Sequence, residues 1–268
     1  MHHQLTVTKK WIAVFCFFYL SVTNINAQTN KWSVGIAFGV ASPIGKFGDT
    51  QIFDSSAAFT IAGPALNLQV DYRLNRYLGF SVLFTGQQNK VDTKMMATKF
   101  QKAVYGAFFN ISSGDWNIGK IMGGVNLFIP FDEKQKLNLS ARIMAGILKT
   151  TLPKIEITEA YYSDSLGNVA LSKFSKEKVP LSWTFAYLAG IGLRYNISND
   201  IFLQAAVDYS ASSPEVPYYP VGARAFTPGA YPITGSTQIT VLPNPTQPKT
   251  FKQPINSLNI CLGIGINF

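Results

Sequence analysis

Large apolar side chains alternate with small or polar ones over long parts of this chain. In the last eleven residues, 258–268, every second position from Leu258 to Phe268 is large and apolar, and asparagine, cysteine or glycine stands between them. A period of two places successive side chains on opposite faces of a β-strand. The repeated alternation therefore predicts strands with one apolar face and one polar or bare face.

The alternation predicts eight strands along the chain. They cover residues 32–41, 66–74, 78–85, 116–130, 137–143, 183–195, 201–210 and 258–268. In the fourth strand the apolar positions change phase near Gly123–Gly124, and this change predicts a β-bulge. A further short strand over 238–242 would pair within the last long link, so ten strands remain the alternative.

The links between these strands are alternately short and long. Short links cover 75–76, 131–136 and 196–200, and long links run roughly over 42–62, 88–115, 153–180 and 212–254. Short turns at one rim and long loops at the other are typical of outer-membrane barrels. The expected fold is therefore all-β: an eight-stranded antiparallel up-and-down transmembrane β-barrel.

The composition of the two faces indicates which one meets lipid. A soluble barrel of the lipocalin type would turn its large apolar residues inward and leave lysine and glutamate outside. Here the second face is rich in glycine, alanine and serine and poor in lysine, which suits the crowded interior of an eight-stranded barrel. Aromatic residues also gather near both predicted rims, as expected at membrane interfaces. They are Trp32, Tyr72, Tyr77, Tyr195 and Phe268 at the short-turn rim and Phe84, Trp116, Trp183 and Tyr209 at the long-loop rim.

The N-terminus has the pattern of a secretory signal peptide. Two lysines precede an apolar stretch from Trp11 to Val22, and the small residue Ala27 stands at the expected cleavage point. The stretch is too short for a comfortable transmembrane helix, which needs roughly 20 residues. The expected domains are residues 1–27, removed on export, and residues 28–268, the barrel.

Cleavage at this point would leave little catalytic chemistry in the chain. His2 and His3 would be lost, so no histidine would remain, and Cys261 would be the one cysteine left. Histidine is the usual base of enzymatic barrels because its pKa lies near neutrality. Asp71 and Asp208 form the one predicted pair of lumenal carboxylates, and each stands beside arginines. We therefore expect no enzyme, no cofactor and no metal site.

Five charged residues fall on the predicted lumenal face. Asp71, Arg73 and Arg194 should lie near the short-turn rim, with Arg142 and Asp208 closer to the middle. Buried charges are tolerated when they are paired and hydrogen-bonded. These residues predict either a salt-bridge network that closes the lumen or a narrow polar pathway for small ions.

The chain resembles the small outer-membrane β-barrel family of Gram-negative bacteria, the OmpA transmembrane domain and OmpX-like proteins among them. The stretch DYRLNRYLGF and the Asn-Ala-Gln junction are similar to barrel proteins of the Bacteroidetes group. The resemblance implies an outer-membrane location and a final strand that signals to the barrel-assembly machinery. Phe268 matches the terminal aromatic of that signal, Ile266 the apolar position before it and Gly263 the internal glycine, whereas Cys261 departs from the usual polar residue.

Binding residues are expected on the long loops, where recognition usually resides on a rigid scaffold. In the second loop Lys94, Lys99 and Lys102 alternate with apolar residues, which predicts either a short amphipathic helix whose lysines meet lipopolysaccharide phosphates or a solvated basic loop. The third loop predicts a hairpin. The fourth holds nine of the fourteen prolines and predicts a stiff cap or a ledge for a partner protein or glycan. Its aromatic residues are Tyr218, Tyr219, Phe226 and Tyr231.

These patterns predict a monomeric, non-enzymatic outer-membrane barrel with a structural, adhesive or surface-binding role. The alternative is a channel or transporter for small or hydrophobic molecules. The net charge of +9 does not indicate a nucleic-acid partner, because the expected compartment holds none.

Overall fold

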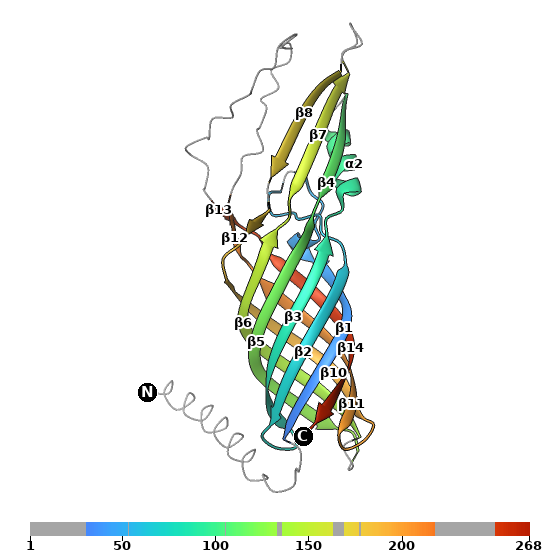
Figure 1. Ribbon diagram of the computed structural model, residues 1–268, viewed down its shortest axis with the longest axis vertical. Helices are drawn as coiled ribbons and strands as arrows, with labels where there is room; N and C mark the ends of the chain where they lie inside the picture. Colours follow the sequence, from blue (N-terminus) through green and yellow to red (C-terminus); the bar gives the residue numbers. More distant parts are fainter. Residues whose placement is uncertain are drawn as a thin grey trace, which may run out of the picture.

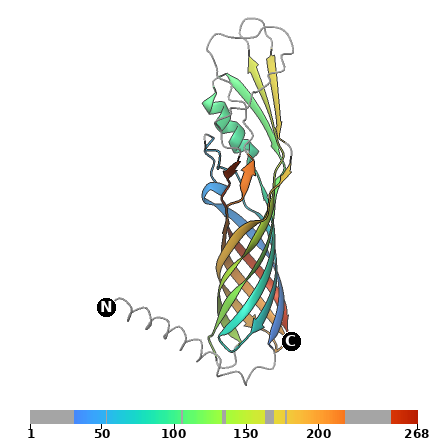
Figure 2. The ribbon, with the colours of Figure 1, turned by 90° about the vertical axis from the view of Figure 1, so that its left-hand side faces the viewer.

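Eight long antiparallel strands close into a narrow barrel in the computed structural model (Figures 1 and 2). The structure describes residues 31–52, 54–104, 106–132, 136–162, 169–176, 178–217 and 250–268. The barrel strands are β1 (Trp32–Ile44), β2 (Gly63–Arg73), β3 (Leu78–Lys90), β5 (Asp115–Pro130), β6 (Leu137–Leu152), β10 (Thr184–Asn196), β11 (Ile201–Ser212) and β14 (Ile255–Asn267). Each pairs with the barrel strand that follows it in the chain, and β14 pairs with β1.

The predicted eight-stranded barrel is confirmed. The ring of pairings closes with eight strands, and the segment 238–242 of the ten-strand alternative lies outside the described residues. The observed strands extend beyond the predicted ones mainly at the long-loop end, where β6 continues to Leu152 and β3 to Lys90. No helix in the part of the chain that the structure describes is both long and apolar enough to span a membrane.

The predicted bulge at Gly123–Gly124 is wrong. The register of β5 with β3 and with β6 runs without interruption through both glycines. The apolar residues change face because the lumen itself changes character: Trp116, Ile118 and Met122 point inward and are buried near the long-loop end. In this part of β5 the apolar side chains are on the inner face, although the alternation of the backbone continues without a break.

A bulge does occur where β9 (Val179–Pro180) leads into β10. Pro180 pairs with Thr151 and Thr184 with Leu148, so four steps along one strand face three along the other. The extra residue reverses which side chains point into the barrel. As a result Leu181 is buried on the inside, whereas Trp183, two residues later, is exposed on the outside.

A three-stranded sheet stands beyond the long-loop end of the barrel (Figure 1). It consists of β4 (Ala107–Ser113), β7 (Ile155–Tyr162) and β8 (Val169–Lys176), so the predicted hairpin of the third loop is present. The β4–β7 ladder continues the β5–β6 ladder in the same register, and the Gly114 amide donates to the Lys154 carbonyl at 2.8 Å between them. Two pairs of strands therefore run almost without a break from the barrel wall into the outer sheet.

The remaining elements lie at the long-loop end. They are η2 (Gly45–Phe47), α2 (Thr93–Ala103), β12 (Glu215–Pro217) and β13 (Thr250–Lys252). The helix α2 packs on the outer sheet, η2 contacts β14, and β12 pairs with β13 in the register of β11 and β14. The side chain of Asp92 caps α2 by accepting the Met95 amide at 2.9 Å. The apolar side of the helix packs on β4, with the rings of Phe100 and Phe109 5.5 Å apart. We call α2, the sheet β4–β7–β8 and the loop residues 48–52 and 54–58 the outer platform.

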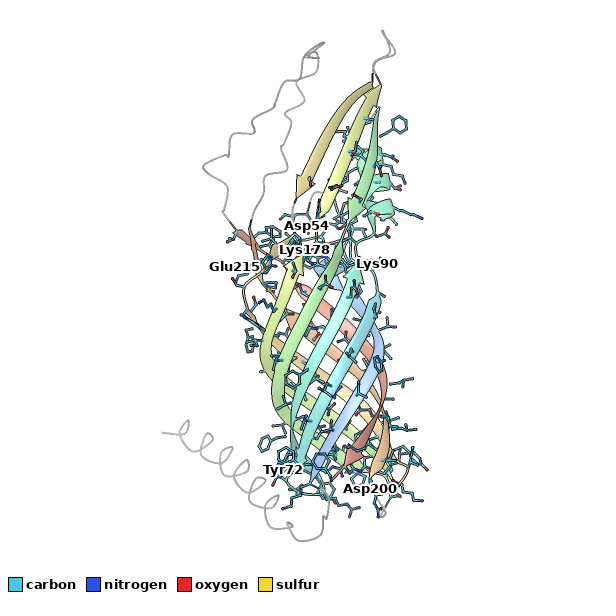
Figure 3. The ribbon with its side chains drawn as sticks, viewed as in Figure 1. Asp54, Tyr72, Lys90, Lys178, Asp200 and Glu215 are labelled. Carbon is cyan, nitrogen blue, oxygen red and sulfur yellow. The ribbon has the colours of Figure 1, made fainter. Side chains whose placement is uncertain are left out.

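The outside of the barrel is apolar over all eight strands. Ile143 is 74% exposed and Leu262 68%, values that a surface bathed in water rarely shows over so wide an area. Such a wall fits the hydrocarbon of a bilayer, where a closed barrel satisfies every backbone hydrogen bond. Figure 3 shows Tyr72 and Asp200 at the short-turn end and Lys90 and Asp54 at the long-loop end.

Most predicted rim aromatics point outward, but Trp116 does not. Its indole is 3% exposed and packs edge-on against the ring of Phe47, with centroids 5.5 Å apart. The same shift of apolar residues to the inner face of β5 explains this wrong prediction. Trp183, which is 53% exposed, lies on the outer wall as expected.

Candidate functional site: a closed lumen beneath an outer platform

Asp71 is the centre of a hydrogen-bonded cluster near the short-turn end of the lumen. Its carboxylate accepts from Gln69 Nε2 at 2.6 Å, from Ser81 Oγ at 2.5 Å and from Ser33 Oγ at 3.3 Å. The Arg194 guanidinium lies 3.5 Å away. All five side chains are buried, so this charge is paired and solvated by the protein itself.

The two arginines at this level are also held by aromatic rings. The guanidinium carbon of Arg194 lies 3.5 Å from the centroid of Phe202, and that of Arg73 lies 4.4 Å from the centroid of Phe128. Arg194 additionally donates to Asn267 Oδ1. Stacking on a ring stabilises a cation that has few carboxylates nearby.

Arg142 and Asp208 form a second layer closer to the middle of the barrel. Nε of Arg142 donates to Oδ1 at 2.8 Å and Nη2 to Oδ2 at 2.5 Å, a bidentate pair with Asp208 completely buried. The third nitrogen of Arg142 donates to Gln69 Oε1, which links this layer to the cluster around Asp71. A glycine at position 190 leaves room for the carboxylate, because a Cβ there would overlap Asp208 Oδ1.

The structure thus connects four of the five predicted lumenal charges, Asp71, Arg194, Arg142 and Asp208, in two layers, while Arg73 stacks on Phe128. A pocket lined by Gln69, Asp71, Arg142 and Arg194, among others, measures about 20 Å³. That is about the volume one water molecule needs. A hydrated ion or solute would have to displace side chains at this level.

Lys120 is a lumenal cation that the sequence analysis missed. Its ammonium is buried and donates to Ser210 Oγ at 2.6 Å, Gln87 Oε1 at 3.0 Å and Ser257 Oγ at 3.4 Å. No carboxylate forms an ion pair with it among the described residues. The predicted bulge in β5 would point the side chain of Lys120 out of the barrel. Without the bulge, side chains alternate without interruption from Asp115 onward, and Lys120 points into the lumen.

An apolar plug packs in the lumen beside Lys120, reaching from slightly nearer the short-turn end up to the long-loop end. Its barrel residues are Leu83, Ile118, Met122, Met144, Leu148 and Leu188. The plug continues upward into the loops through Phe47, Trp116, Leu181, Val216 and Ile255, all of which are buried. The lumen is therefore filled by paired charges nearer the short-turn end, and by apolar side chains packed beside Lys120 and its polar partners nearer the long-loop end.

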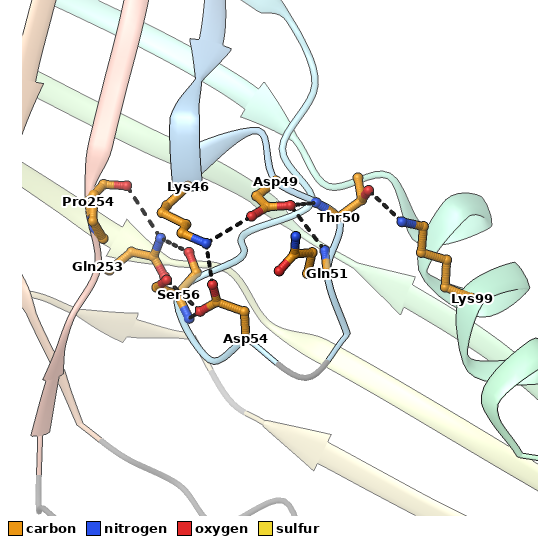
Figure 4. Close-up of polar contacts among 9 residues, drawn as sticks. All are labelled: Lys46, Asp49, Thr50, Gln51, Asp54, Ser56, Lys99, Gln253 and Pro254. Carbon is orange, nitrogen blue, oxygen red and sulfur yellow. Dashed lines mark hydrogen bonds and ion pairs between the residues drawn. The ribbon is translucent and has the colours of Figure 1, made fainter.

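The loop beside α2 is held by exposed ion pairs (Figure 4). The Lys46 ammonium donates to Asp54 at 2.5 Å and to Asp49 at 3.1 Å. The hydrogen bonds from Lys46 and Ser56 lower the pKa of Asp54 to about 2. Asp49 also accepts the Thr50 amide at 2.7 Å, so a charged lysine fixes the turn that faces the helix.

A hollow of about 600 Å³ separates this loop from α2. Its lining residues are Thr50, Gln51, Ile52, Asp54, Lys99, Lys102 and Ala103. Lys99 spans one side by donating to Thr50 Oγ1 at 2.8 Å, whereas Lys102 is exposed and forms no ion pair within the described residues. Since Asp54 is bound by Lys46, the hollow presents two lysines one helical turn apart.

The other predicted site residues have different positions. Lys94 is exposed on α2 but does not line the hollow. Ile266 and Phe268 point outward at the short-turn end, and Gly263 lies so close to β1 that a Cβ would overlap the Ile36 carbonyl. The residue at the predicted cleavage point, Ala27, and the four loop aromatics Tyr218, Tyr219, Phe226 and Tyr231 lie outside the described residues.

Comparisons with known proteins add resemblances to solved structures. No protein-family model matches the chain, and none of the curated proteins matches it. Among solved structures, it is similar to the attachment invasion locus protein Ail of Yersinia pestis, at 12% identity over 90% of this chain and 100% of that one, with a TM-score of 0.40. It is also similar to Neisserial surface protein A, at 10% identity over 88% and 97% with a TM-score of 0.43, and to OprG of Pseudomonas aeruginosa, at 12% over 89% and 97% with a TM-score of 0.44.

Proposed function

We propose that this protein is a non-conducting, non-enzymatic barrel of the outer membrane of a Gram-negative bacterium. The barrel acts as a rigid, single-copy scaffold that holds the outer platform at the cell surface, and the final strand with Gly263, Ile266 and Phe268 directs its assembly. The apolar wall and the short turns opposite long loops support this location and orientation.

The closed lumen is the observation that carries the proposal. A channel needs a continuous polar path with room for an ion, whereas the pocket at the two charged layers measures about 20 Å³ and the apolar plug occupies part of the lumen beyond them. Moving a hydrated ion past packed side chains and buried ion pairs would cost several kcal/mol of desolvation. The side chains inside the barrel are therefore suited to stabilising the fold and not to conducting ions.

Single-channel recording of the folded protein in a planar bilayer tests this point. We expect no discrete openings, because neither layer has room for a hydrated ion. A heat-modifiable band on a gel must show that the inserted protein is folded. Steady openings under these conditions would contradict the scaffold and favour the channel alternative.

The platform hollow supports binding of an anionic glycan at the surface. Lys99 and Lys102 supply charge, Thr50 and Gln51 supply hydrogen-bonding groups, and Ile52 supplies an apolar floor suited to a sugar face. Sulfate, phosphate or carboxylate groups are the natural partners of two neighbouring ammonium groups.

Charge reversal at the hollow should weaken this binding. We expect K99E/K102E to bind dextran sulfate about tenfold less tightly than the original chain, because like charges then face the polyanion. The matched control is K94E, which changes the same helix outside the hollow and should lose much less. Uncharged dextran reports non-ionic binding, and equal losses in both variants would contradict a site at the hollow.

A further inference from the structure

The outer wall of the barrel contains a second, larger hollow near its long-loop end. Its volume is about 910 Å³, and its lining comes from β1, β2, β3, β5 and β6 together with Trp183. The strand register explains its shape. One row of outward positions runs across five neighbouring strands, in the order Phe38, Leu66, Gly86, Gly119 and Lys149.

The floor of this hollow is bare because two glycines pair across β3 and β5. Gly86 lies opposite Gly119, and a Cβ at Gly86 would have no heavy atom within 4 Å. A Cβ at Gly119 would touch only the Lys149 carbonyl, at 4.0 Å. On a wall that carries mostly large apolar side chains, this pair leaves a depression between Phe38 and Leu66 on one side and Lys149 on the other.

The two remaining walls differ in chemistry. On the side toward the middle of the barrel, Phe84 and Ile121 form an apolar edge. On the long-loop side, Gln88 and Asn117 present amides, and Gln88 donates to Asp115 at 2.8 Å. The hollow is thus apolar toward the bilayer centre and polar toward the membrane surface.

Lys149 is an unusual residue for a lipid-facing strand. Its side chain is exposed, its ammonium lies 5.3 Å from the centroid of Trp183, and it forms no ion pair with any described residue. The bulge before β10 is what turns Trp183 outward over this lysine. A lipid-facing cation is costly unless it reaches the interface or meets an anion.

From these observations we propose that the Gly86–Gly119 hollow binds one molecule of a lipid A-type lipid from the outer leaflet, with an acyl chain over the glycines and a phosphate on Lys149. The apolar edge matches the chain, and the amides of Gln88 and Asn117 match the sugar head group. This site is separate from the platform hollow and does not depend on how the platform functions.

Native mass spectrometry tests the proposal directly. The full protein is folded into phosphatidylcholine vesicles that contain equal amounts of lipid A and phosphatidylglycerol, then released in mild detergent. We expect the original chain to retain one lipid A. Removing the charge with K149Q should reduce retention about fivefold, the factor expected for one basic side chain near an anionic head group. Filling the floor with G86L should reduce it similarly.

Two matched controls accompany these variants. G123L places the same side chain on the same face at another glycine with nothing within 4 Å, and K90Q removes an exposed lysine outside the lining of the hollow. Both should retain lipid A like the original chain, and the gel shift on heating checks folding of every variant. Equal retention in K149Q and G86L as in their controls would overturn the site. Equal retention of phosphatidylglycerol would overturn the lipid A assignment, and a dimer lost in G86L would instead assign the hollow to a contact between copies.

Discussion

Replacing Arg142 by methionine is expected to lower the free energy of unfolding by about 3–5 kcal/mol, because it leaves a buried carboxylate unpaired. Asp208 is completely buried and receives two hydrogen bonds from Arg142. Gln69 would lose its donor in the same variant. Urea-induced unfolding from lipid vesicles, followed by tryptophan fluorescence, measures the loss.

The control is the double variant R142M/D208L. Apolar replacement of both members of a buried ion pair is often neutral or stabilising, whereas removal of one member is not. The double variant should therefore recover most of the stability that R142M loses. A double variant as unstable as the single one would show that the layer depends on Gln69 and its neighbours instead of the ion pair.

Leu148→Ala is expected to be the second severe substitution, with a loss of about 2–5 kcal/mol from a cavity in the apolar plug. Leu148 is completely buried in the apolar cluster on the lumenal side of β6. The surrounding side chains are held by eight paired strands and have little freedom to collapse into the space.

The neighbouring residue provides the comparison. Ile147 points to the lipid side and is 42% exposed. Ile147→Ala should cost only about 1–2 kcal/mol, the transfer of the lost methyl groups, because acyl chains fill the gap. The same unfolding experiment measures both variants. Equal losses would mean that the plug is loosely packed and that the lumen is less firmly closed than the contacts indicate.

The barrel could be predicted from the sequence because its evidence is local. Alternation at period two identifies a strand without any knowledge of its partners, and the spacing of the links orders the strands around the ring. The lumenal charges were predictable for the same reason. Asp71, Arg142 and Asp208 interrupt apolar patterns whose outward positions are unmistakable.

The orientation of the β5 side chains could not be predicted in this way. Alternation shows which face of a strand is apolar, but not which face points out of the barrel. The plug makes the inner face apolar as well, so Ile118 and Met122 look like lipid-facing residues. For this reason the sequence pattern does not identify Lys120 as a lumenal charge. Only the pairing of β5 with β3 and β6 decides the question.

The two hollows were beyond prediction for another reason. The platform hollow needs α2 and the loop around Asp54 to meet, and that meeting depends on Lys46 and Lys99 reaching across separate loops. The wall hollow needs Gly86 and Gly119 to be paired, which is a matter of register. Neither glycine is distinctive in the sequence.

The shared register of β5 with β4 and of β6 with β7 has a mechanical consequence. A force that pulls on the outer sheet is transmitted along the strands into the barrel wall, through the same ladder that crosses Gly114 and Lys154. Ladder hydrogen bonds lie across the strand direction, so such a force loads them in shear and many of them resist together. A load on the outer sheet would therefore be shared along the barrel strands, because the two ladders keep one register and the Gly114–Lys154 hydrogen bond joins them.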